Sequence, residues 1–577
     1  MHSLKTIFKL LNYKQKKAVF YLGVMIVIGA CLELLGISLI LPIIDILQNP
    51  DSNIYKNFIS DSNKFFGKFF ENQNFIFLAL FIVYLIKNIF LGFLTWLQFR
   101  WSANIQIFFS KKLFLTYLTR PYLFHKKKNS SELFRNLEEV DMLGRSISSG
   151  LAFITEIALI LGIFILLIVI QPMAAIFSLI TFGLMSLIIL YFTKNRLVKY
   201  GEDRQNYLNE RVRSIRESFG FAIKEIKLNQ SEDEFLEIYN NHNTNYAKVG
   251  LKASTVQELP KYFFEQFALL VIMMLIVILN FLGNSNTEVV SILGLFVFAT
   301  FRILPSIKKI MHSYQYISYG QAAINLIQSE ISDDRNLKKV FNSNTKKIDE
   351  IDFKENIKFK NVNFFYDNES NITLENLNFE IEKNKTIGIF GKSGSGKSTL
   401  VDLFSGLIIP TKGQILLDNK IDISQNYNLW QKKIGYVSQN IFLLDDTIKN
   451  NILFSKKNLH VDIELMENIL EKTGLKNFIK NLPNGLNTII GELGAKISGG
   501  EIQRIGIARV LYKKPEILIF DESTNALDAE NELKVFQTIK NLKNKCTILL
   551  ITHKKNNLAI CDEVLEIDNK KIKKIII

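Results

Sequence analysis

The sequence predicts a multidomain protein in which an all-α domain with six transmembrane helices precedes an α/β domain. Long apolar runs are confined to roughly the first 310 of the 577 residues, and the remainder has the composition of a soluble domain. In that second part, an apolar stretch at 386–390 leads into the glycine-rich segment Gly391–Ser398 and then into a sequence that can begin a helix. A strand, a glycine-rich loop and a helix in this order are typical of α/β phosphate-binding folds. We expect four segments: an amphipathic helix at 1–17, the membrane domain at 18–331, a polar linker at 332–356 and the α/β domain at 357–577.

Composition narrows the classes of partner. The net charge of +15 would fit a nucleic-acid-binding protein. In a chain with membrane spans, however, lysine and arginine usually mark the cytoplasmic loops, so we expect no nucleic acid partner. The three cysteines, Cys31, Cys546 and Cys561, have no metal-ligand spacing and suggest no disulfide framework. We expect no cleavable signal peptide, because the first apolar run is too long.

Six apolar stretches, each close to the length of about 20 residues that crosses a bilayer, predict the membrane spans. They lie at 18–47, 75–100, 148–170, 173–194, 263–283 and 288–304. The connections 101–147 and 195–262 are strongly basic, whereas 171–172 and 284–288 hold no lysine or arginine, and 48–74 holds three lysines. The positive-inside rule therefore predicts cytoplasmic termini, with residues 1–17 on the inner membrane surface.

The two basic connections keep helical periodicity and contain few helix-breaking residues. We expect them to extend the membrane helices into the cytoplasm and to turn over at short elbows, near 121–129 and near 219–229. The favoured role of these elbows is to bind the α/β domain, and the alternative is a solvated helical linker.

The glycine-rich segment has the spacing of a phosphate-binding loop. Its glycines allow the backbone to curl closely around a phosphate chain, and the N–H groups of the loop and of the helix N-terminus face the anion. Lys397 is suited to the β- and γ-phosphates, and the Ser398 hydroxyl to Mg²⁺. Tyr366 is a candidate to stack on the base, with a plain strand aromatic as the alternative. The expected nucleotide contacts are Gly391, Ser393, Gly394, Ser395, Gly396, Lys397, Ser398 and Thr399.

Three further strand ends carry catalytic candidates. The apolar stretch 515–520 ends in two carboxylates: Asp521 is suited to hold Mg²⁺, and Glu522 to deprotonate or orient the water that attacks the γ-phosphate. His553 follows another apolar strand and can contact the γ-phosphate, and Gln439 follows a third and can bind Mg²⁺ and water. Because ligands bind beyond the carboxyl ends of parallel strands, we expect these side chains at one edge of the sheet. A helix N-cap at 521–522 and a structural role for His553 are the alternatives.

The segment 497–504 predicts a second anion-binding helix terminus. Ser498 stands at a predicted N-cap and is followed by Gly499, Gly500 and Glu501. Because one phosphate chain does not need two such termini from one domain, the economical explanation is that this one caps a nucleotide held by another copy of the chain.

Together these motifs resemble, in order and over nearly the whole chain, those of ATP-binding cassette (ABC) exporters. The matching positions are Gly391–Ser398, Gln439, Gly491–Gly494, Ser498–Gly500, Asp521–Glu522, Asn525–Asp528 and His553. The resemblance implies a six-helix transmembrane exporter domain joined to a P-loop nucleotide-binding domain, and an ATPase coupled to transport that uses ATP and Mg²⁺. It also implies a homodimer in the bacterial inner membrane with its nucleotide-binding domains in the cytoplasm, because the family's working unit has two such domains and twelve spans. The chain departs from the family pattern at Ile497, Glu501 and Asn525, which we expect to tune turnover.

Charged residues within the predicted spans are the clues to the substrate, because such residues are costly in lipid. Glu33, Lys87 and Arg302 are candidates to contact a charged headgroup, and an internal ion pair between Glu33 and Lys87 is the alternative. The stretch 32–42 is similar to the corresponding helix of bacterial lipid-linked oligosaccharide flippases. That similarity implies a lipid-like substrate, with Lys87 and Arg302 at its pyrophosphate. An exporter of peptides or hydrophobic drugs and an ATP-gated channel are the other candidates.

Overall fold

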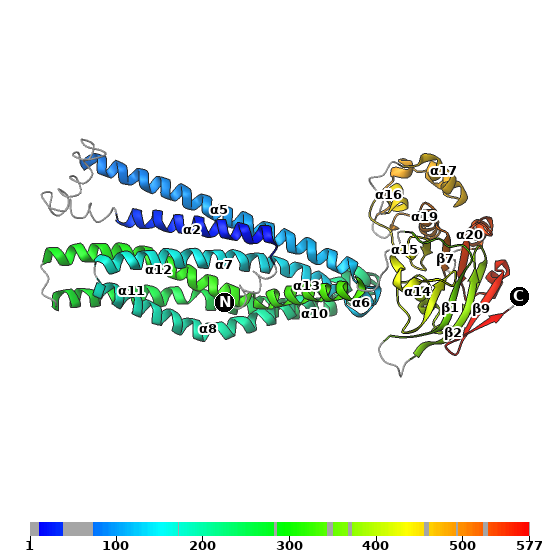
Figure 1. Ribbon diagram of the computed structural model, residues 1–577, viewed down its shortest axis with the longest axis horizontal. Coiled ribbons are helices and arrows are strands. Elements are labelled where there is room, and N and C mark those ends of the chain that lie inside the picture. The colour runs from blue at the N-terminus through cyan, green and yellow to red at the C-terminus, as the bar shows by residue number, and fades with distance from the viewer. Residues whose placement is uncertain are drawn as a thin grey trace. The chain divides into compact units, whose positions relative to one another are not determined.

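The computed structural model (Figure 1) describes residues 11–38, 73–170, 172–281, 286–342, 350–366, 372–454, 461–491, 494–522 and 529–575. Some side chains inside these ranges, that of Arg302 among them, lie outside the description. The chain divides into two compact units. One comprises Met1–Arg120 and His125–Lys338, and the other comprises Pro121–Phe124 and Lys339–Ile577.

Long helices running side by side build the first unit (Figure 1). Its elements are α2 (Tyr13–Ser38), α5 (Gln73–Thr119), the last part of α6 (Tyr122–Lys127), α7 (Ser130–Ile170), α8 (Pro172–Ile215), the π-helix η2 (Arg216–Phe221), α9 (Ile223–Asn229), α10 (Glu232–Glu258), α11 (Pro260–Phe281), α12 (Asn286–Tyr319) and most of α13 (Gln321–Asn342). Helix α5 has 47 residues and α8 has 44. At about 1.5 Å per residue, each is roughly twice as long as a bilayer core is thick.

Four helices among the described residues are long and apolar enough to cross a membrane. They cover Tyr13–Gly36, Phe81–Thr119, Ser130–Val169 and Ala175–Phe221. Helices α11 and α12 correspond to the other two predicted spans, and both contain side chains outside the description. Proline stands at the first position of α8 and of α11, where its missing N–H has no intrahelical partner to lose.

Short elements occupy the predicted elbow positions. Helix α6 lies within 121–129, and η2 with α9 covers 216–229. The side chain of Asn129 accepts the Ser131 N–H at 3.0 Å, which satisfies a donor in the first turn of α7. Residues Pro121–Phe124 group with the second unit, and Leu123 packs against its core.

Three predicted boundaries differ from the structure. The amphipathic helix predicted at 1–17 lies mostly outside the described residues, and its last part, from Tyr13, already belongs to α2. The end predicted for the membrane domain at 331 falls inside a separate helix, because α12 ends at Tyr319 and α13 begins after Gly320. The linker predicted from residue 332 begins later, since α13 runs to Asn342. A helix that has already formed extends at little cost per residue, so a polar sequence alone does not end it.

Two sheets form the framework of the second unit. The six-stranded sheet has the order β10-β9-β3-β8-β7-β6, and the four-stranded sheet has the order β2-β1-β4-β5. In the larger sheet β10 pairs antiparallel with β9, and all other pairs are parallel. The strands are β1 (Asn356–Phe365), β2 (Ile372–Glu382), β3 (Thr386–Gly391), β4 (Lys412–Leu417), β5 (Ile421–Asp422), β6 (Ile434–Val437), β7 (Ile517–Asp521), β8 (Thr547–Ile551), β9 (Glu563–Asp568) and β10 (Lys571–Ile575). The principal helices are α14 (Lys397–Phe404), α15 (Tyr427–Gln431), α16 (Ile448–Leu453), α17 (Ile463–Lys472), α18 (Lys476–Lys480), α19 (Gly499–Leu511) and α20 (Ala529–Leu542).

The central strands are buried, as their apolar sequences predict. All five residues of β8 and the first four of β7 are buried, which is the pattern of parallel strands covered on both faces. Because β3, β6, β7 and β8 are parallel neighbours, their carboxyl ends meet at one edge of the sheet. The fold therefore delivers the phosphate loop and the three predicted catalytic strand ends to the same edge.

Candidate active site

The phosphate loop connects β3 to α14 and depends on glycine at two positions with left-handed backbone. Gly394 has a φ of 79° and Gly396 a φ of 103°, a region that glycine enters without strain. A Cβ at Gly396 would lie 2.9 Å from the Leu374 side chain, whereas one at Gly394 would meet nothing within 4 Å. The contact between Gly396 and Leu374 seats the loop against β2. The open space at Gly394 leaves room for a phosphate.

Lys397 places its ammonium group inside this loop. Its Nζ donates hydrogen bonds to the carbonyl oxygens of Gly391 at 2.9 Å and Lys392 at 3.0 Å, and the residue is buried. A Cβ at Gly391 would lie 2.7 Å from the Ser395 hydroxyl, so the loop closes too tightly for a side chain there. The loop therefore surrounds a fixed positive charge at the N-terminus of α14, which is an arrangement that binds phosphate.

Tyr366 and Thr399 link β1 to the first turn of α14. The Tyr366 hydroxyl lies 3.1 Å from Thr399 Oγ1, and its ring packs edge-to-face on Phe364 with centroids 4.9 Å apart. This contact brings Tyr366 to the phosphate loop, and its stacking on the base stays a prediction. Ser393 and Ser398 are exposed on the loop and at the start of α14.

Glu522 lies between the two other predicted catalytic side chains. Gln439 Nε2 donates to Glu522 Oε2 at 3.4 Å, and His553 Nδ1 lies 3.7 Å from Glu522 Oε1. Glu522 has a φ of 46°, a left-handed conformation that is strained for a residue with a side chain. The strand ends of β6, β7 and β8 thus bring these three residues together, as the parallel sheet predicted. Asn525, in the loop that follows, lies outside the described residues.

Asp521 is held by a residue that sequence reasoning did not single out. The Tyr436 hydroxyl donates to Asp521 Oδ2 at 2.7 Å. Burial raises the pKa of the Asp521 carboxyl, the Tyr436 hydrogen bond lowers it, and nearby Glu522 and Asp402 raise it again. Burial and the Asp521 charge also raise the pKa of Tyr436 well above its usual value. A partly buried carboxylate of this kind favours a bound cation.

The Ser498 turn forms a capping box at the start of α19. Glu501 donates its backbone N–H to Ser498 Oγ at 3.4 Å, and the Glu501 carboxylate accepts the Ser498 N–H at 2.7 Å. Glutamate or glutamine at the third helical position completes this motif. Glu501, where the chain departs from the usual family residue, therefore has a local role in capping α19. Ser498 and Gly499 are exposed, and a Cβ at Gly499 would meet nothing within 4 Å. The turn is therefore accessible to an anion from outside the chain.

Within the membrane unit, two of the three substrate candidates pair with each other. Lys87 Nζ lies 3.4 Å from Glu33 Oε2, both residues are buried, and Lys87 also lies 4.0 Å from the centroid of the Tyr84 ring. Glu33 and Lys87 thus form the ion pair that was the alternative prediction, and their contact with a substrate stays a prediction. Arg302 belongs to α12, and its side chain lies outside the description.

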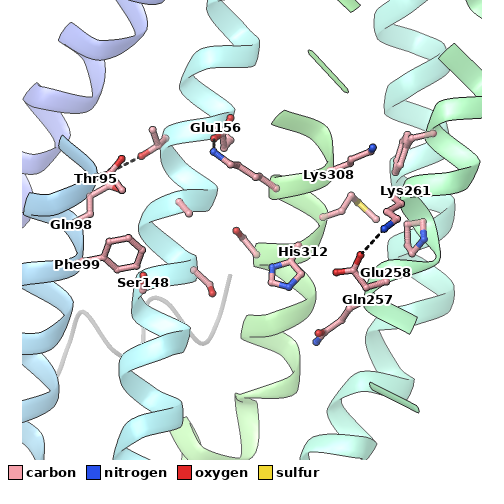
Figure 2. A pocket seen from close by; sticks show the side chains of 18 residues that line it. Thr95, Gln98, Phe99, Ser148, Glu156, Gln257, Glu258, Lys261, Lys308 and His312 are labelled. Atoms are coloured by element: carbon pink, nitrogen blue, oxygen red, sulfur yellow. Dashed lines mark hydrogen bonds and ion pairs between the residues drawn. The ribbon is translucent and has the colours of Figure 1, made fainter. Parts of the chain in front are cut away.

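A cavity of about 420 Å³, lined by both polar and apolar side chains, lies between α5, α7, α12 and the junction of α10 with α11 (Figure 2). It is lined by Thr95, Gln98, Phe99, Ser148, Ser149, Ala152, Thr155, Glu156, Gln257, Glu258, Pro260, Lys261, Phe264, Lys308, Lys309, Met311, His312 and Ser313. None of the predicted substrate candidates, Glu33, Lys87 and Arg302, is among these residues. The signal that could have found the cavity is the recurrence of polar residues near the inner ends of four spans.

Comparisons with known proteins agree with this architecture. One family model, the ABC transporter transmembrane region, matches residues 19–304, and another, the ABC transporter, matches residues 374–525. An ATP-dependent lipid A-core flippase from Wigglesworthia glossinidia brevipalpis is 27% identical over 495 residues, which cover 83% of this chain and 81% of that protein. The α-hemolysin translocation ATP-binding protein HlyB from Escherichia coli O6:H1 is 28% identical over 87% of this chain and 70% of that protein.

A solved structure has the same fold. The structure of a bacterial Atm1-family ABC exporter with ATP bound matches with a TM-score of 0.76 at 20% identity, covering 97% of this chain and 95% of that chain. The two matched regions follow one another on a single polypeptide, in the order membrane region and nucleotide-binding domain. The chain therefore belongs to the ABC transporters, as an exporter half-transporter whose ATPase drives movement of a substrate across the membrane.

Proposed function

We propose that the protein works as a homodimer with two ATP sites, each formed by the Lys397 loop of one chain and the Ser498 turn of the other. The exposed Ser498 turn supports this arrangement, because it offers an anion-binding helix terminus that the phosphate loop of its own domain does not need. One nucleotide-binding domain and six predicted spans are also half of the family's working unit. ATP held in this way stabilises the closed pair of domains, and hydrolysis releases them.

Mg²⁺ fits the donor set of Ser398, Gln439 and Asp521. Hydroxyl, amide and carboxylate oxygens are the ligands that this hard cation prefers, and the partly buried Asp521 carboxylate is suited to a divalent partner. When bound, the ion would neutralise charge on the phosphate oxygens.

Glu522 is the proposed general base. Its carboxylate orients the attacking water and accepts a proton from it, while Gln439 and His553 hold the carboxylate from its two sides. His553 is also proposed to contact the γ-phosphate. The elbows then transmit the opening and closing of the nucleotide-binding domains to membrane helices that alternate between inward and outward openings.

A lipid-like molecule is the proposed substrate, flipped or exported across the bacterial inner membrane. The observation that carries this proposal is a cavity lined by both charged and apolar side chains, inside a helical unit that exposes many large apolar side chains. A headgroup can occupy such a cavity while its acyl or prenyl chain stays in the bilayer. The relative named a lipid A-core flippase, and the similarity of residues 32–42 to lipid-linked oligosaccharide flippases, support the same class.

Export of a peptide is the second candidate. HlyB and the leukotoxin export protein LtxB from Aggregatibacter actinomycetemcomitans are each 28% identical to this chain over 519 residues. This is as close as the flippase relative, so identity alone does not separate the two classes.

ATPase stimulation in proteoliposomes tests the proposal. The panel should contain polyprenyl-linked sugars, lipopolysaccharide precursors, peptides and dyes, and the Glu522→Gln variant should serve as the inactive control. We expect stimulation by the lipid-linked compounds. A response confined to peptides or dyes would contradict the lipid substrate, and full activity in a strictly monomeric preparation would contradict the dimeric ATP site.

A further inference from the structure

Helix α19 joins the Ser498 turn to the segment that follows Gln439. The turn stands exposed at the N-terminus of the helix, and Arg509 lies in its last turn. The helix has 13 residues, so at about 1.5 Å per residue it is roughly 20 Å long. Its C-terminal end is held against β6, since a Cβ at Gly435 would lie 2.2 Å from the Val510 side chain. A displacement of the exposed N-terminal end would therefore tilt the helix about this contact.

The Arg509 guanidinium holds the segment after Gln439 by three hydrogen bonds. Its Nη1 donates to the Phe442 carbonyl oxygen at 2.8 Å, its Nε to the Asn451 carbonyl oxygen at 2.9 Å, and its Nη2 to Asn451 Oδ1 at 3.2 Å. Asn451 is fully buried, and its side chain bonds both the N–H and the carbonyl of Leu444, at 2.8 and 2.9 Å. The planar fork of donors on one arginine thus attaches both ends of segment 442–451 to α19.

Apolar packing attaches the same segment a second time. A Cβ at Gly506, on α19, would lie 2.3 Å from the Ile441 side chain, so the two backbones approach closely there. Leu443 is buried in one cluster with Ile505 and Ala508 of α19. Since polar and apolar contacts agree, we infer that residues 441–451 follow any movement of α19.

Gln439 lies between this attached segment and the central sheet. Two residues before it, β6 ends at Val437, and β6 pairs with β7, which leads to Glu522. Gln439 is exposed, and its Nε2 lies 3.4 Å from Glu522 Oε2, beyond the usual range of about 2.7–3.2 Å for such bonds. The hydrogen bond to Glu522 is therefore too weak to fix Gln439, and its position depends on where segment 441–451 is held.

We propose that Arg509 is a positioning residue that couples the two ATP sites of the dimer. A phosphate bound at the Ser498 turn tilts α19, Arg509 passes the tilt to segment 441–451, and Gln439 moves toward Glu522. The inference rests on the proposed homodimer, in which the Ser498 turn contacts the nucleotide of the partner. Filling one site then speeds hydrolysis at the other, through the chain that contributes its Ser498 turn to the first site and its Gln439 to the second.

The test uses full-length heterodimers purified through two different tags. The blocked copy carries Glu522→Gln, so that its own site is expected to hold ATP without hydrolysis, and the active copy keeps Glu522. Both sites are filled with labelled ATP, Mg²⁺ starts the reaction, and the readout is the rate constant for the first release of phosphate. Because a single turnover is followed, later opening of the dimer does not enter the measurement.

The two placements of Arg509→Met distinguish coupling from a structural role. In the active copy, the variant should lower the rate constant about tenfold, within the usual range for coupling between sites. In the blocked copy it should have a much smaller effect, because the Gln439 that it displaces serves the site that does not react. A merely structural loss in α19 would slow the reaction from either copy, since the Ser498 turn of the blocked copy belongs to the reacting site. Lys480→Met in the active copy removes an exposed cation of α18 and is the control, with no change expected.

The outcomes also separate this inference from the proposed function. Equal loss from the two placements, or no loss from either, would overturn the role of Arg509 and leave the shared ATP site standing. Ser498→Ala in the blocked copy should slow the reaction, and a normal rate there would overturn the shared site together with the inference. If Arg509→Met does not assemble, Arg509→Lys decides the outcome by the same comparison, because lysine keeps the charge and lacks the planar fork that holds Phe442 and Asn451 together.

Discussion

The Tyr436 hydroxyl donates a hydrogen bond to Asp521 Oδ2 at 2.7 Å, joining two residues 85 positions apart on the adjacent parallel strands β6 and β7. The bond stabilises a carboxylate that burial would otherwise leave poorly solvated. It also fixes the direction of the side chain that is proposed to hold Mg²⁺. Tyr436 is thus a positioning residue of the ATP site.

Tyr436→Phe should destabilise the nucleotide-binding domain. Loss of a hydrogen bond to a charged group costs about 1.5–3 kcal/mol when it is buried, and the lower end applies here because both groups are partly exposed. Thermal unfolding of the purified protein without nucleotide measures the effect. Because Asp521→Asn replaces the charged acceptor with a neutral one, the destabilisation caused by Tyr436→Phe should be smaller in the Asp521→Asn background. Equal destabilisation in both backgrounds would show that the hydrogen bond is not its cause.

Asp521→Asn should make the protein without nucleotide more stable at neutral pH. Because the folded-state pKa of Asp521 is raised, mainly by burial, the charged carboxylate opposes folding once the pH rises above that pKa. The advantage of the asparagine variant should therefore be largest at pH 7–8 and shrink as the pH falls toward the ordinary aspartate value of about 3.9. Thermal unfolding of both proteins at several pH values gives this difference, and an advantage that grows on acidification would contradict the sign.

Local sequence signals predicted much of the ATP site. The loop at 391–398, the strand ends at Gln439 and His553 and the carboxylates at 521–522 each follow an apolar strand. Parallel strands bring their carboxyl ends to one edge, so the meeting of Glu522 with Gln439 and His553 followed from topology. Tyr436 could not be found in this way, because it points toward its partner from within a strand. No local pattern distinguishes it from an ordinary strand tyrosine.

Features that depend on contacts between distant helices were harder to predict. The break between α12 and α13 falls at Gly320, where a Cβ would lie 2.1 Å from the Ser146 hydroxyl of α7. The cavity of Figure 2 collects residues from five helices, and these residues come together only when those helices pack. The Gly320 contact has no signature along the chain. The polar residues near the inner ends of the spans do not reveal which helices meet, because periodicity reports which face of a helix is apolar and not which neighbour it contacts.

Glu522→Gln should bind ATP, trap the closed dimer and lower hydrolysis by roughly 10²–10⁴-fold, the range for loss of a general base. The glutamine keeps the size of the side chain and its hydrogen bonding but cannot accept the proton. The measurements are phosphate release at saturating ATP and the fraction of dimer in detergent with ATP present. Glu471→Gln, an exposed carboxylate of α17 paired with Lys476 at 3.4 Å, is the control. Normal turnover in Glu522→Gln would show that Glu522 is not the general base.

Gly201→Ala should destabilise the membrane unit. A Cβ at Gly201 of α8 would lie 2.1 Å from the Tyr319 carbonyl oxygen of α12, so the two helices would have to separate. Overpacking of this kind costs about 1–3 kcal/mol. Gly183→Ala is the matched control on the same helix, because a Cβ there meets nothing within 4 Å. Thermal unfolding in detergent should show a lower midpoint for the first variant and not for the second.

Removing both charges of the Glu33–Lys87 pair separates a structural role from a substrate role. Lys87→Met alone leaves the buried Glu33 carboxylate without its cation, and breaking a buried pair in this way costs about 3–5 kcal/mol. Glu33→Gln combined with Lys87→Met removes both charges, so stability in detergent should largely recover. If the pair is structural, the double variant should also keep its ATPase stimulation by the lipid panel, because no substrate contact has been lost. A double variant that is stable but whose ATPase is not stimulated by the panel would indicate that Lys87 contacts the headgroup, because unfolding could not explain the lost stimulation.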